Sequence, residues 1–375
     1  MSSAYLDHAA TTPVRPVAVA AMRRLLDEPP GNPSGAHRAA QRARRHLDES
    51  RDAVAALAGR SPTEVYFTSG GTEADDLAVC GHAERGVVVC PATEHHAVLD
   101  PVHRAGGRVV PVDRSGAVDL DALADRLDDE VSLVSVMAAN NETGRLADLG
   151  AIAAVLRDRA PAALLHTDAV QAAGWLDLGV LAADADLVSV TGHKLGGPMG
   201  SGALLVRRGA EPPPRLIGGG QERDLRSGTP NLPGAVGFAA AAAEVVAGRR
   251  PAAEAVARLR DRLEDGLLAA RDGVEPTVDR PDRLPGICHL VIDGVMAESV
   301  IVLLDEAGVS ASAASSCASG ATGASHVLTA MGADLAARST LRLSLGWSAT
   351  DADSDHVLEV LPPIVRRLRA HRQVA

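Results

Sequence analysis

Lysine is almost absent from the 375-residue chain: of its 37 basic residues, all but Lys194 are arginine. Arginine carries a positive charge and binds anions through its planar fork, but it does not lose a proton to attack a carbonyl carbon. A lysine amine does so once burial or a nearby positive charge lowers its pKa. Lys194 lies in residues 187–202, between an apolar segment and a run of glycines. This position indicates amine chemistry, with a chance lysine on a surface loop as the alternative.

Aromatic residues are scarce as well, with two each of tryptophan, tyrosine and phenylalanine, and the net charge is −11. Nucleic-acid binding depends on basic groups that neutralise phosphates and on rings that stack on bases. The sequence therefore predicts no direct nucleic-acid partner. We interpret a group of arginines as the solvated face of a helix: Arg38, Arg42, Arg44, Arg45 and Arg51.

Long apolar runs are missing too, and none reaches the length that crosses a bilayer. Residues 1–10 lack the basic start and apolar block of a signal peptide, so we expect a cytoplasmic protein with no membrane partner. The cysteines show no C-x-x-C spacing, which predicts neither a disulfide nor a structural metal site. They are Cys80, Cys90, Cys288 and Cys317.

What remains is the composition of a globular protein, 46% hydrophobic and 23% charged. The length exceeds one ordinary core and predicts a large domain at residues 13–247 and a small α+β domain at 1–12 and 248–375. Short apolar segments alternate with segments of helical spacing, which indicates an α/β fold with a mostly parallel seven-stranded sheet. The predicted strands are residues 65–68, 87–90, 109–112, 131–138, 163–167, 187–190 and 202–206. Two long helices, at 233–247 and 252–270, are expected to lead to the small domain.

Polar motifs follow several of the predicted strands, where an open parallel sheet places its ligand crevice. In FTSGGTE, the backbone N–H groups of Gly71 and Thr72 at a helix start suit a phosphate monoester, although such a turn is often only structural. In TEHH, His95 is a metal ligand or a residue that stacks on a ring or handles a proton; the missing third ligand and the position past a strand end favour the ring-stacking or proton-handling role. In NNETG, Asn141 binds a substrate carboxylate or ring substituent, or belongs to an asparagine-rich turn.

The motif HTDAVQ is more specific. An aspartate at the end of an apolar strand is unfavourable without a partner, and a protonated pyridine nitrogen is a suitable one for Asp168. Gln171 is placed to reach the neighbouring ring hydroxyl, while Thr191 and His193 flank the lysine as further phosphate donors. With Lys194 as a Schiff-base amine, these residues indicate pyridoxal 5'-phosphate as the cofactor.

Residues 310–325 contain only Ser, Ala, Gly and Thr apart from Cys317. No side chain there anchors a core, so we expect a mobile loop. A thiol in its middle favours a swinging nucleophile over an inert linker. Arg342, in the next predicted strand, is a candidate for bidentate binding of a substrate carboxylate.

On these motifs the chain resembles the NifS/IscS-type cysteine desulfurases, in the class V aminotransferase branch of the fold-type I pyridoxal-phosphate enzymes. The match covers almost the whole chain, in the family's order. The matching segments are YLDHAATTP, GNPSGAH, FTSGGTEADDLA, TEHHAVLD, NNETG, HTDAVQ, TGHK, GGGQERDLRSGT, SHVL and LRLSLG.

The resemblance implies removal of sulfur from L-cysteine to give L-alanine and a persulfide on Cys317, ten residues before Val327. It implies catalytic roles for Lys194 and for His95, which would stack on the ring. It also implies a homodimer and a sulfur-acceptor protein, an iron–sulfur scaffold or a thiolation enzyme. The implied cofactor ligands are Gly71, Thr72, His95, Asn141, Asp168, Gln171, Thr191, His193, Lys194 and, from the other subunit, Thr229. The implied substrate ligands are Asn141, Arg342 and Asn32.

Three departures from the family pattern concern Asp76, where asparagine is usual, Leu343, where phenylalanine is usual, and the loop around Cys317. The loop bears on the acceptor more than on the chemistry, because the thiol is retained. Two other functions stay open on the sequence: a pyridoxal-phosphate lyase or aminotransferase for another amino acid (selenocysteine, cysteine sulfinate or a thiol adduct), and a non-catalytic sulfur-relay scaffold.

Overall fold

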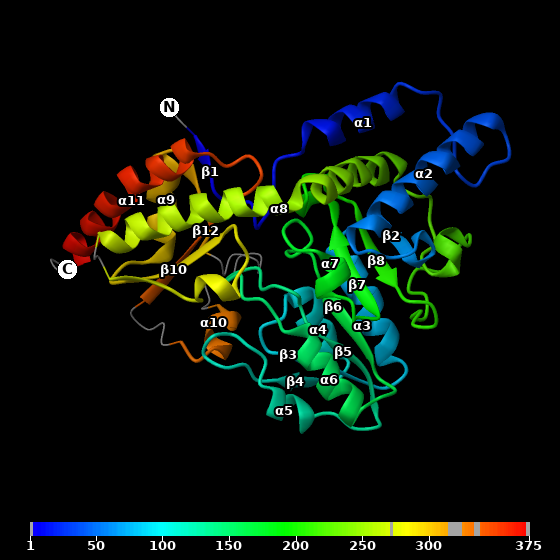
Figure 1. Cartoon of the computed structure of the whole chain (residues 1–375), viewed down its shortest axis with the longest axis horizontal. Coiled ribbons are helices and arrows are strands. Elements are labelled where there is room, and N and C mark those ends of the chain that lie inside the picture. Colours follow the sequence, from blue (N-terminus) through cyan, green and yellow to red (C-terminus); the bar gives the residue numbers. More distant parts are fainter. Residues whose placement is uncertain (1–2, 271–272, 314–324, 334–337, 373–375) are drawn as a thin grey trace.

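A large sheet and a small sheet, joined by one long helix, organise the chain (Figure 1). The computed structural model describes residues 3–270, 273–313, 325–333 and 338–372. The large sheet has seven strands in the order β2-β8-β7-β6-β5-β3-β4. Only β8 runs antiparallel to its neighbours, so the predicted mostly parallel sheet is confirmed. The strands are β2 (Val65–Thr68), β3 (Val87–Pro91), β4 (Arg108–Val110), β5 (Val131–Ser135), β6 (Leu164–Asp168), β7 (Leu187–Thr191) and β8 (Gly202–Val206).

Helices cover both faces of the large sheet, which explains why its strands are mostly apolar. Successive residues of a strand point to opposite faces. Leu133 packs into the cluster that includes α3 and α4, whereas Val134 packs into the cluster that includes α2 and α6. The helices are α2 (Arg38–Leu57), α3 (Gly71–Ala83), α4 (His96–Arg104), α5 (Leu120–Ala124), α6 (Leu149–Arg159) and α7 (Leu178–Leu181).

A second core surrounds the small antiparallel sheet, whose order is β12-β10-β9. The N-terminal strand joins this core: β1 pairs with β11, and Ala4 and Leu6 are buried beside residues such as Leu341. Two cores of this kind favour the division at residues 12–13 and 247–248, which stays a prediction. The elements are β1 (Ala4–Tyr5), β9 (Val274–Pro276), β10 (Ile287–Asp293), β11 (Val309–Ser310), β12 (Arg338–Ser344), α9 (Ala297–Glu306), α10 (His326–Ala330) and α11 (Asp351–Arg372).

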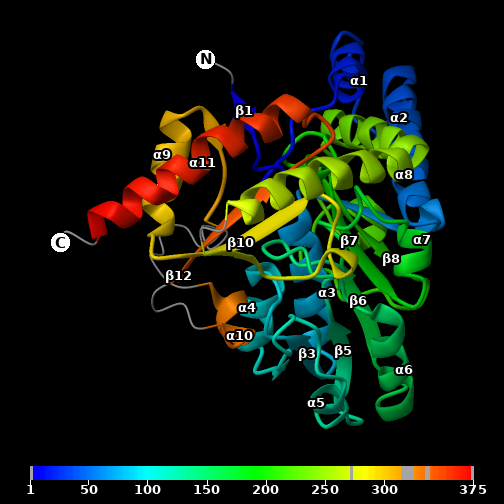
Figure 2. The same cartoon turned by 60° about the vertical axis from the view of Figure 1, so that its left-hand side comes forward.

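The connection between the cores is a single helix, α8 (Leu232–Ala269), so the predicted break after residue 247 is wrong. Inside a helix, glycine is unfavourable by about 1 kcal/mol and proline by about 3 kcal/mol relative to alanine. The free-energy cost of Gly248 and Pro251 in α8 is outweighed because the helix is anchored in a core on each side of them (Figures 1 and 2). Each large apolar side chain that is buried contributes about 1.5–3 kcal/mol. The anchors are Phe238 and Val245 in the first core, and Val256, Leu263 and Leu267 in the second.

Two features near the N-terminus differ from the expectations. A helix, α1 (Pro16–Leu26), was not predicted, because exposed apolar residues such as Val17 and Val19 obscure its pattern and Ala18 is its one buried residue. The solvated interpretation of the arginines on α2 is wrong for Arg51, which is buried and paired with Glu222.

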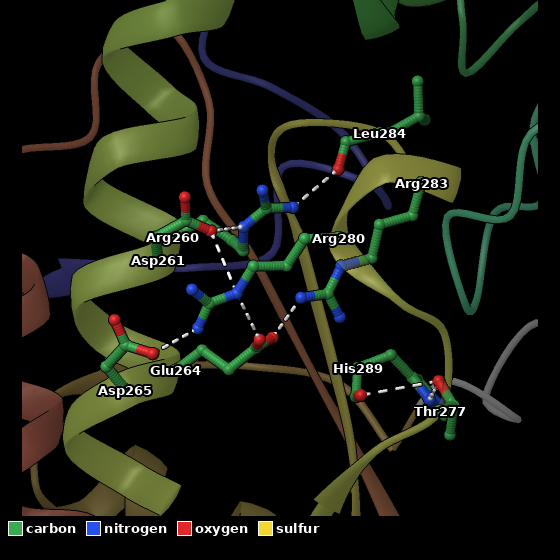
Figure 3. Close-up of polar contacts among 9 residues, drawn as sticks. All are labelled: Arg260, Asp261, Glu264, Asp265, Thr277, Arg280, Arg283, Leu284 and His289. Carbon is green, nitrogen blue, oxygen red and sulfur yellow. Dashed lines mark hydrogen bonds and ion pairs between the residues drawn. The ribbon is translucent and has the colours of Figure 1, made fainter.

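A buried polar cluster ties α8 to the loop before β10 (Figure 3). Glu264 of α8 accepts hydrogen bonds from Arg280, at 2.8 Å, and from Arg283. The loop also contacts the large domain, where Leu284 donates its N–H to the Gly144 carbonyl at 2.9 Å. The contacts of α8 thereby reach the NNETG segment.

Among the helices that the structure describes, none combines the length and the apolar composition that crossing a bilayer requires.

Candidate active site

Lys194 closes a short 3-10 turn, Gly192–Lys194, directly after β7. Its side chain is half-buried, and Nζ donates to the carbonyl oxygens of Ala9 and, at 2.7 Å, of Ala10. Parallel strands end at one edge of a sheet, so β7 brings Lys194 to the edge where β3, β5 and β6 also end. The amine therefore lies at the position predicted for the ligand crevice.

Asp168 is the last residue of β6 and lies beside the lysine. Burial raises the pKa of its carboxyl group to about 6, against the opposing effects of the Val170 N–H, which donates to Oδ1 at 2.8 Å, and of the Lys194 charge. A buried carboxylate of this kind is stabilised by a positively charged partner. The position is suited to a ligand that carries a proton on a ring nitrogen.

Gln171 meets Lys194 at the N-terminal segment. Its Nε2 donates to the Ala9 carbonyl at 2.9 Å, the same oxygen that Lys194 contacts. Both side chains line a narrow cavity of about 30 Å³ together with His8 and Trp347. The motif YLDHAATTP thus supplies backbone oxygens that hold the two side chains in the crevice.

His95 is the N-cap of α4: its Nδ1 accepts the Ala97 N–H at 3.0 Å. Burial, followed by the charge of Lys194, lowers the pKa of His95 to about 4. The ring is therefore neutral at pH 7, and because Nδ1 is an acceptor its proton lies on Nε2. A neutral, oriented imidazole next to the lysine fits a residue that packs on a cofactor ring.

The predicted phosphate turn lies between β2 and α3. Close packing favours glycine at Gly71 of this turn, where a Cβ would lie 2.8 Å from Val170 Cγ2, and at Gly202 of β8, where a Cβ would lie 2.7 Å from the Gly70 carbonyl carbon. The first backbone N–H groups of a 13-residue helix have no intrahelical acceptor and attract anions. Thr72 is exposed at this helix start.

Thr191 and His193, which were also predicted to bind the phosphate, lie within hydrogen-bond distance of other residues of the chain. Thr191 is buried and its hydroxyl donates to the Ser201 carbonyl at 3.0 Å. His193 Nδ1 lies 3.2 Å from Thr11 Oγ1, and burial lowers the pKa of His193 to about 4. Both residues lie beside Lys194, as the sequence order requires.

Arg342 connects the small sheet to the NNETG segment. It is buried on β12, where Nη1 donates to the Asn141 carbonyl at 2.8 Å and Nη2 to Asp7 Oδ1 at 2.9 Å. Its Nε has no hydrogen-bond partner among the described residues. Asp7 was not predicted, although it stands in the motif YLDHAATTP.

Two predicted ligands lie apart from the lysine. Asn32 is exposed, and its Oδ1 accepts the Ser34 N–H at 3.0 Å. Asn32 and Thr229 line a cavity of about 280 Å³ that Lys194 does not line. Thr229 also lines a cavity of about 120 Å³ with Ser69 of the phosphate turn. Cys317 falls outside the residues that the structure describes.

Two buried acids near Asp168 were also missed, Asp75 on α3 and Glu94 before His95. Burial raises the pKa of both carboxyl groups, and the negative charge of Asp168 raises them further. Glu94 Oε1 accepts the Met137 N–H at 2.6 Å. A helical face shared with Ala78 and Val79 was the available signal that Asp75 is buried.

Known proteins resemble this chain over almost its whole length. The family model "Aminotransferase class-V" matches residues 4–357. An IscS-like cysteine desulfurase of Mycobacterium tuberculosis (strain ATCC 25618 / H37Rv) is 44% identical, over 98% of this chain and 97% of the relative. A cysteine desulfurase of Cereibacter sphaeroides is 42% identical, over 99% and 97%. A solved NifS-like protein superposes with a TM-score of 0.91 at 32% identity, over 98% of this chain and 100% of that chain. The chain therefore belongs to the class V aminotransferase family, and within it to the NifS/IscS-type cysteine desulfurases.

Proposed function

We propose that the chain removes sulfur from L-cysteine with pyridoxal 5'-phosphate, releasing L-alanine and leaving a persulfide on Cys317. The observation that carries this proposal is the placement of Lys194 next to Asp168 at the ends of β7 and β6. The cysteine desulfurases among the relatives support the substrate. A lyase or aminotransferase for another amino acid is not favoured by these relatives.

The residues present fit the cofactor. Asp168 is a buried carboxylate with an acceptor for a pyridinium proton, the start of α3 offers N–H groups to a phosphate, and Lys194 is half-buried beside them. Gln171 is within the same cavity as the lysine and would bind the ring oxygen. When bound, pyridoxal phosphate supplies an aldehyde that bonds amines and a ring that withdraws electrons from Cα.

The chain's own groups then divide the work. Arg342 and Asn141 hold the substrate carboxylate, which orients the Cα–H bond toward Lys194 Nζ. Lys194 takes this proton in its neutral form. The Asp168 carboxylate stays ionised and keeps the proton on the ring nitrogen. Neutral His95 packs beside the lysine without adding a positive charge.

Cys317 completes the reaction as a thiolate, the nucleophilic form of a thiol. Its sulfur attacks the sulfur of the substrate, so that an S–S bond forms while the Cβ–S bond breaks. The electron pair of the broken bond stays with the substrate carbons: Cβ takes up a proton, Cα takes back the proton that Lys194 removed, and the product leaves as alanine. The persulfide on Cys317 carries the sulfur to an acceptor.

The assembly and destination of the sulfur are part of the same proposal. The resemblance favours a homodimer in which Thr229 reaches the phosphate of the other subunit, and Thr229 is exposed. The IscS-type relatives favour iron–sulfur cluster assembly, with a thiolation enzyme, including one for tRNA, as a second acceptor class. A cytoplasmic location accords with both.

Cysteine turnover tests the function directly. The purified chain, loaded with pyridoxal phosphate and given L-cysteine and a thiol reductant, is expected to release alanine and sulfide in equal amounts. Selenocysteine and cysteine sulfinate are the comparison substrates. A chain that turns over either of them while leaving cysteine unchanged contradicts the proposal.

Asp168 makes cofactor binding dependent on pH. Above its pKa of about 6 the carboxyl is ionised and holds a pyridinium proton; below it the carboxyl is neutral. The affinity of the apoprotein for pyridoxal phosphate is therefore expected to fall between pH 7 and 5. Fluorescence titration measures it, with Asp168→Asn as control. The same pH slope in wild type and control contradicts this role.

The raised pKa of Asp168 has the opposite pH dependence for the stability of the apoprotein, which decreases as the pH rises. The folded-state pKa of Asp168 lies above its ordinary value near 3.8, so the folded state binds more protons between these values. The contribution of Asp168 to the free energy of unfolding therefore decreases as the pH rises from about 4 to about 6. Bound cofactor reverses this trend, because its ring cation favours the ionised carboxylate.

A further inference from the structure

The outer edge of β2 is covered by side chains instead of a strand. In the sheet order β2 is the first strand, so its outward backbone groups have no ladder partner. Glu222 Oε2 accepts the Phe67 N–H at 2.9 Å, and Arg51 Nη1 donates to the Val65 carbonyl at 2.6 Å. An unpaired edge invites pairing with other strands. Here two side chains form hydrogen bonds with these backbone groups just before the phosphate turn.

The two covering side chains also bind each other. Arg51 Nη1 and Nη2 donate to Glu222 Oε2 at 2.7 Å and to Oε1 at 2.8 Å. Their side chains are only 10% and 4% exposed. A planar guanidinium in two bonds fixes the orientation of a carboxylate. Glu222 is therefore held in one place relative to β2.

Glu222 begins a run of left-handed backbone that non-glycine residues avoid. The φ angles of Glu222, Arg223 and Asp224 are 47°, 54° and 66°. Arg223 adds a third link to β2, because its guanidinium lies 3.9 Å from the Tyr66 ring centroid and donates to the Val65 carbonyl at 2.6 Å. Strained backbone persists where the surroundings over-determine it, often at functional sites.

The same segment reaches the far side of the phosphate turn. Arg226 donates to Glu73 on α3, from Nε at 2.7 Å and from Nη2 at 3.2 Å. Glu73 Oε2 also accepts the Ser69 N–H at 2.8 Å. Residues 222–226 thus contact the turn through Phe67 before it and through Glu73 after it, and Thr229 follows three residues later.

We propose that Arg51 and Glu222 are positioning residues that fix the turn after β2 against the strained segment that leads to Thr229, so that in the homodimer the turn faces the phosphate of its own subunit and Thr229 faces that of the other. The inference rests on the proposed function, because the phosphate is that of pyridoxal phosphate. Neither residue touches the cofactor. Their effect is confined to the phosphate, because the ring contacts come from the ends of β3, β6 and β7.

Comparing two ligands that differ only in the phosphate tests this role. Glu222→Gln keeps the size of the side chain and an oxygen for the Phe67 N–H, but removes the charge that pairs with Arg51. Its affinity for pyridoxal phosphate is expected to fall about tenfold, the effect of losing one charge-assisted hydrogen bond. Its affinity for pyridoxal, which has no phosphate, is expected to stay within twofold.

Glu264→Gln is the matched control, because it makes the same change in another buried pair, with Arg283 (Figure 3). The control is expected to keep the ratio of the two affinities, whatever it does to the melting temperature. If Glu222→Gln does not fold, Arg51→Lys takes its place and is expected to change the ratio in the same direction. An unchanged ratio in a folded Glu222 or Arg51 variant overturns the inference. A wild-type chain that binds neither ligand overturns the proposed function instead.

Discussion

Lys194→Arg is expected to lower alanine release from L-cysteine by about a thousandfold or more, within the range for loss of a general base and of a covalent attachment. Arginine keeps the positive charge beside Asp168 and reaches the Ala9 and Ala10 carbonyl oxygens, so the crevice stays intact. It does not lose a proton at neutral pH and does not bond to an aldehyde. The loss therefore reports amine chemistry and not charge.

Borohydride reduction followed by peptide mass mapping provides the second measurement. In the wild type, reduction is expected to attach the cofactor to the peptide that contains Lys194, the only lysine of the chain. The matched control is the double variant Lys194→Arg with Arg250→Lys, which returns a lysine at a side chain that is 91% exposed. An adduct at another residue of the wild type, or restored turnover in the double variant, contradicts the assignment of Lys194.

The large sheet was predictable because local signals and tertiary packing agree there. Strands such as Val65–Thr68 and Gly202–Val206 are short apolar segments between turns, and their predicted and observed bounds coincide. Asp119 and Asp148 are N-caps of α5 and α6, a residue type typical of helix starts, and both accept the N–H three residues on. In α8 the local sequence indicates a break, but the packing of both halves of the helix against two cores outweighs it. Those contacts come from distant segments, so no short stretch of sequence shows them.

The part of the candidate site that could be predicted consists of single functional side chains at the ends of strands. Asp168 ends β6, and Lys194 and His95 come shortly after β7 and β3, so sheet topology brings these strand ends to one edge. Pairs that join distant segments were not predictable. Arg342 with Asp7, and Arg51 with Glu222, are separated by more than a hundred residues, and nothing near either partner indicates the other.

Cys317→Ser is expected to abolish persulfide formation and to lower alanine release about a hundredfold or more, while the absorbance of bound cofactor stays as in the wild type. The hydroxyl has the same connectivity as the thiol and is slightly smaller, but it is not ionised at neutral pH. Persulfide is measured by mass spectrometry of the peptide that contains residue 317, and alanine by amino-acid analysis after one minute with L-cysteine.

The raised pKa values of the other three thiols are the reason why the effect is assigned to Cys317. Burial raises the pKa of Cys80 to about 11 and of Cys288 to about 12, and that of Cys90 further still. Because the thiolate is the nucleophile, none of these three is reactive at neutral pH. Cys80→Ser, the most accessible of them, is the matched control and is expected to keep full turnover. Persulfide found on Cys80, or alanine release that survives Cys317→Ser unchanged, places the sulfur chemistry elsewhere, because a reaction without the Cys317 thiolate needs another acceptor for the substrate sulfur.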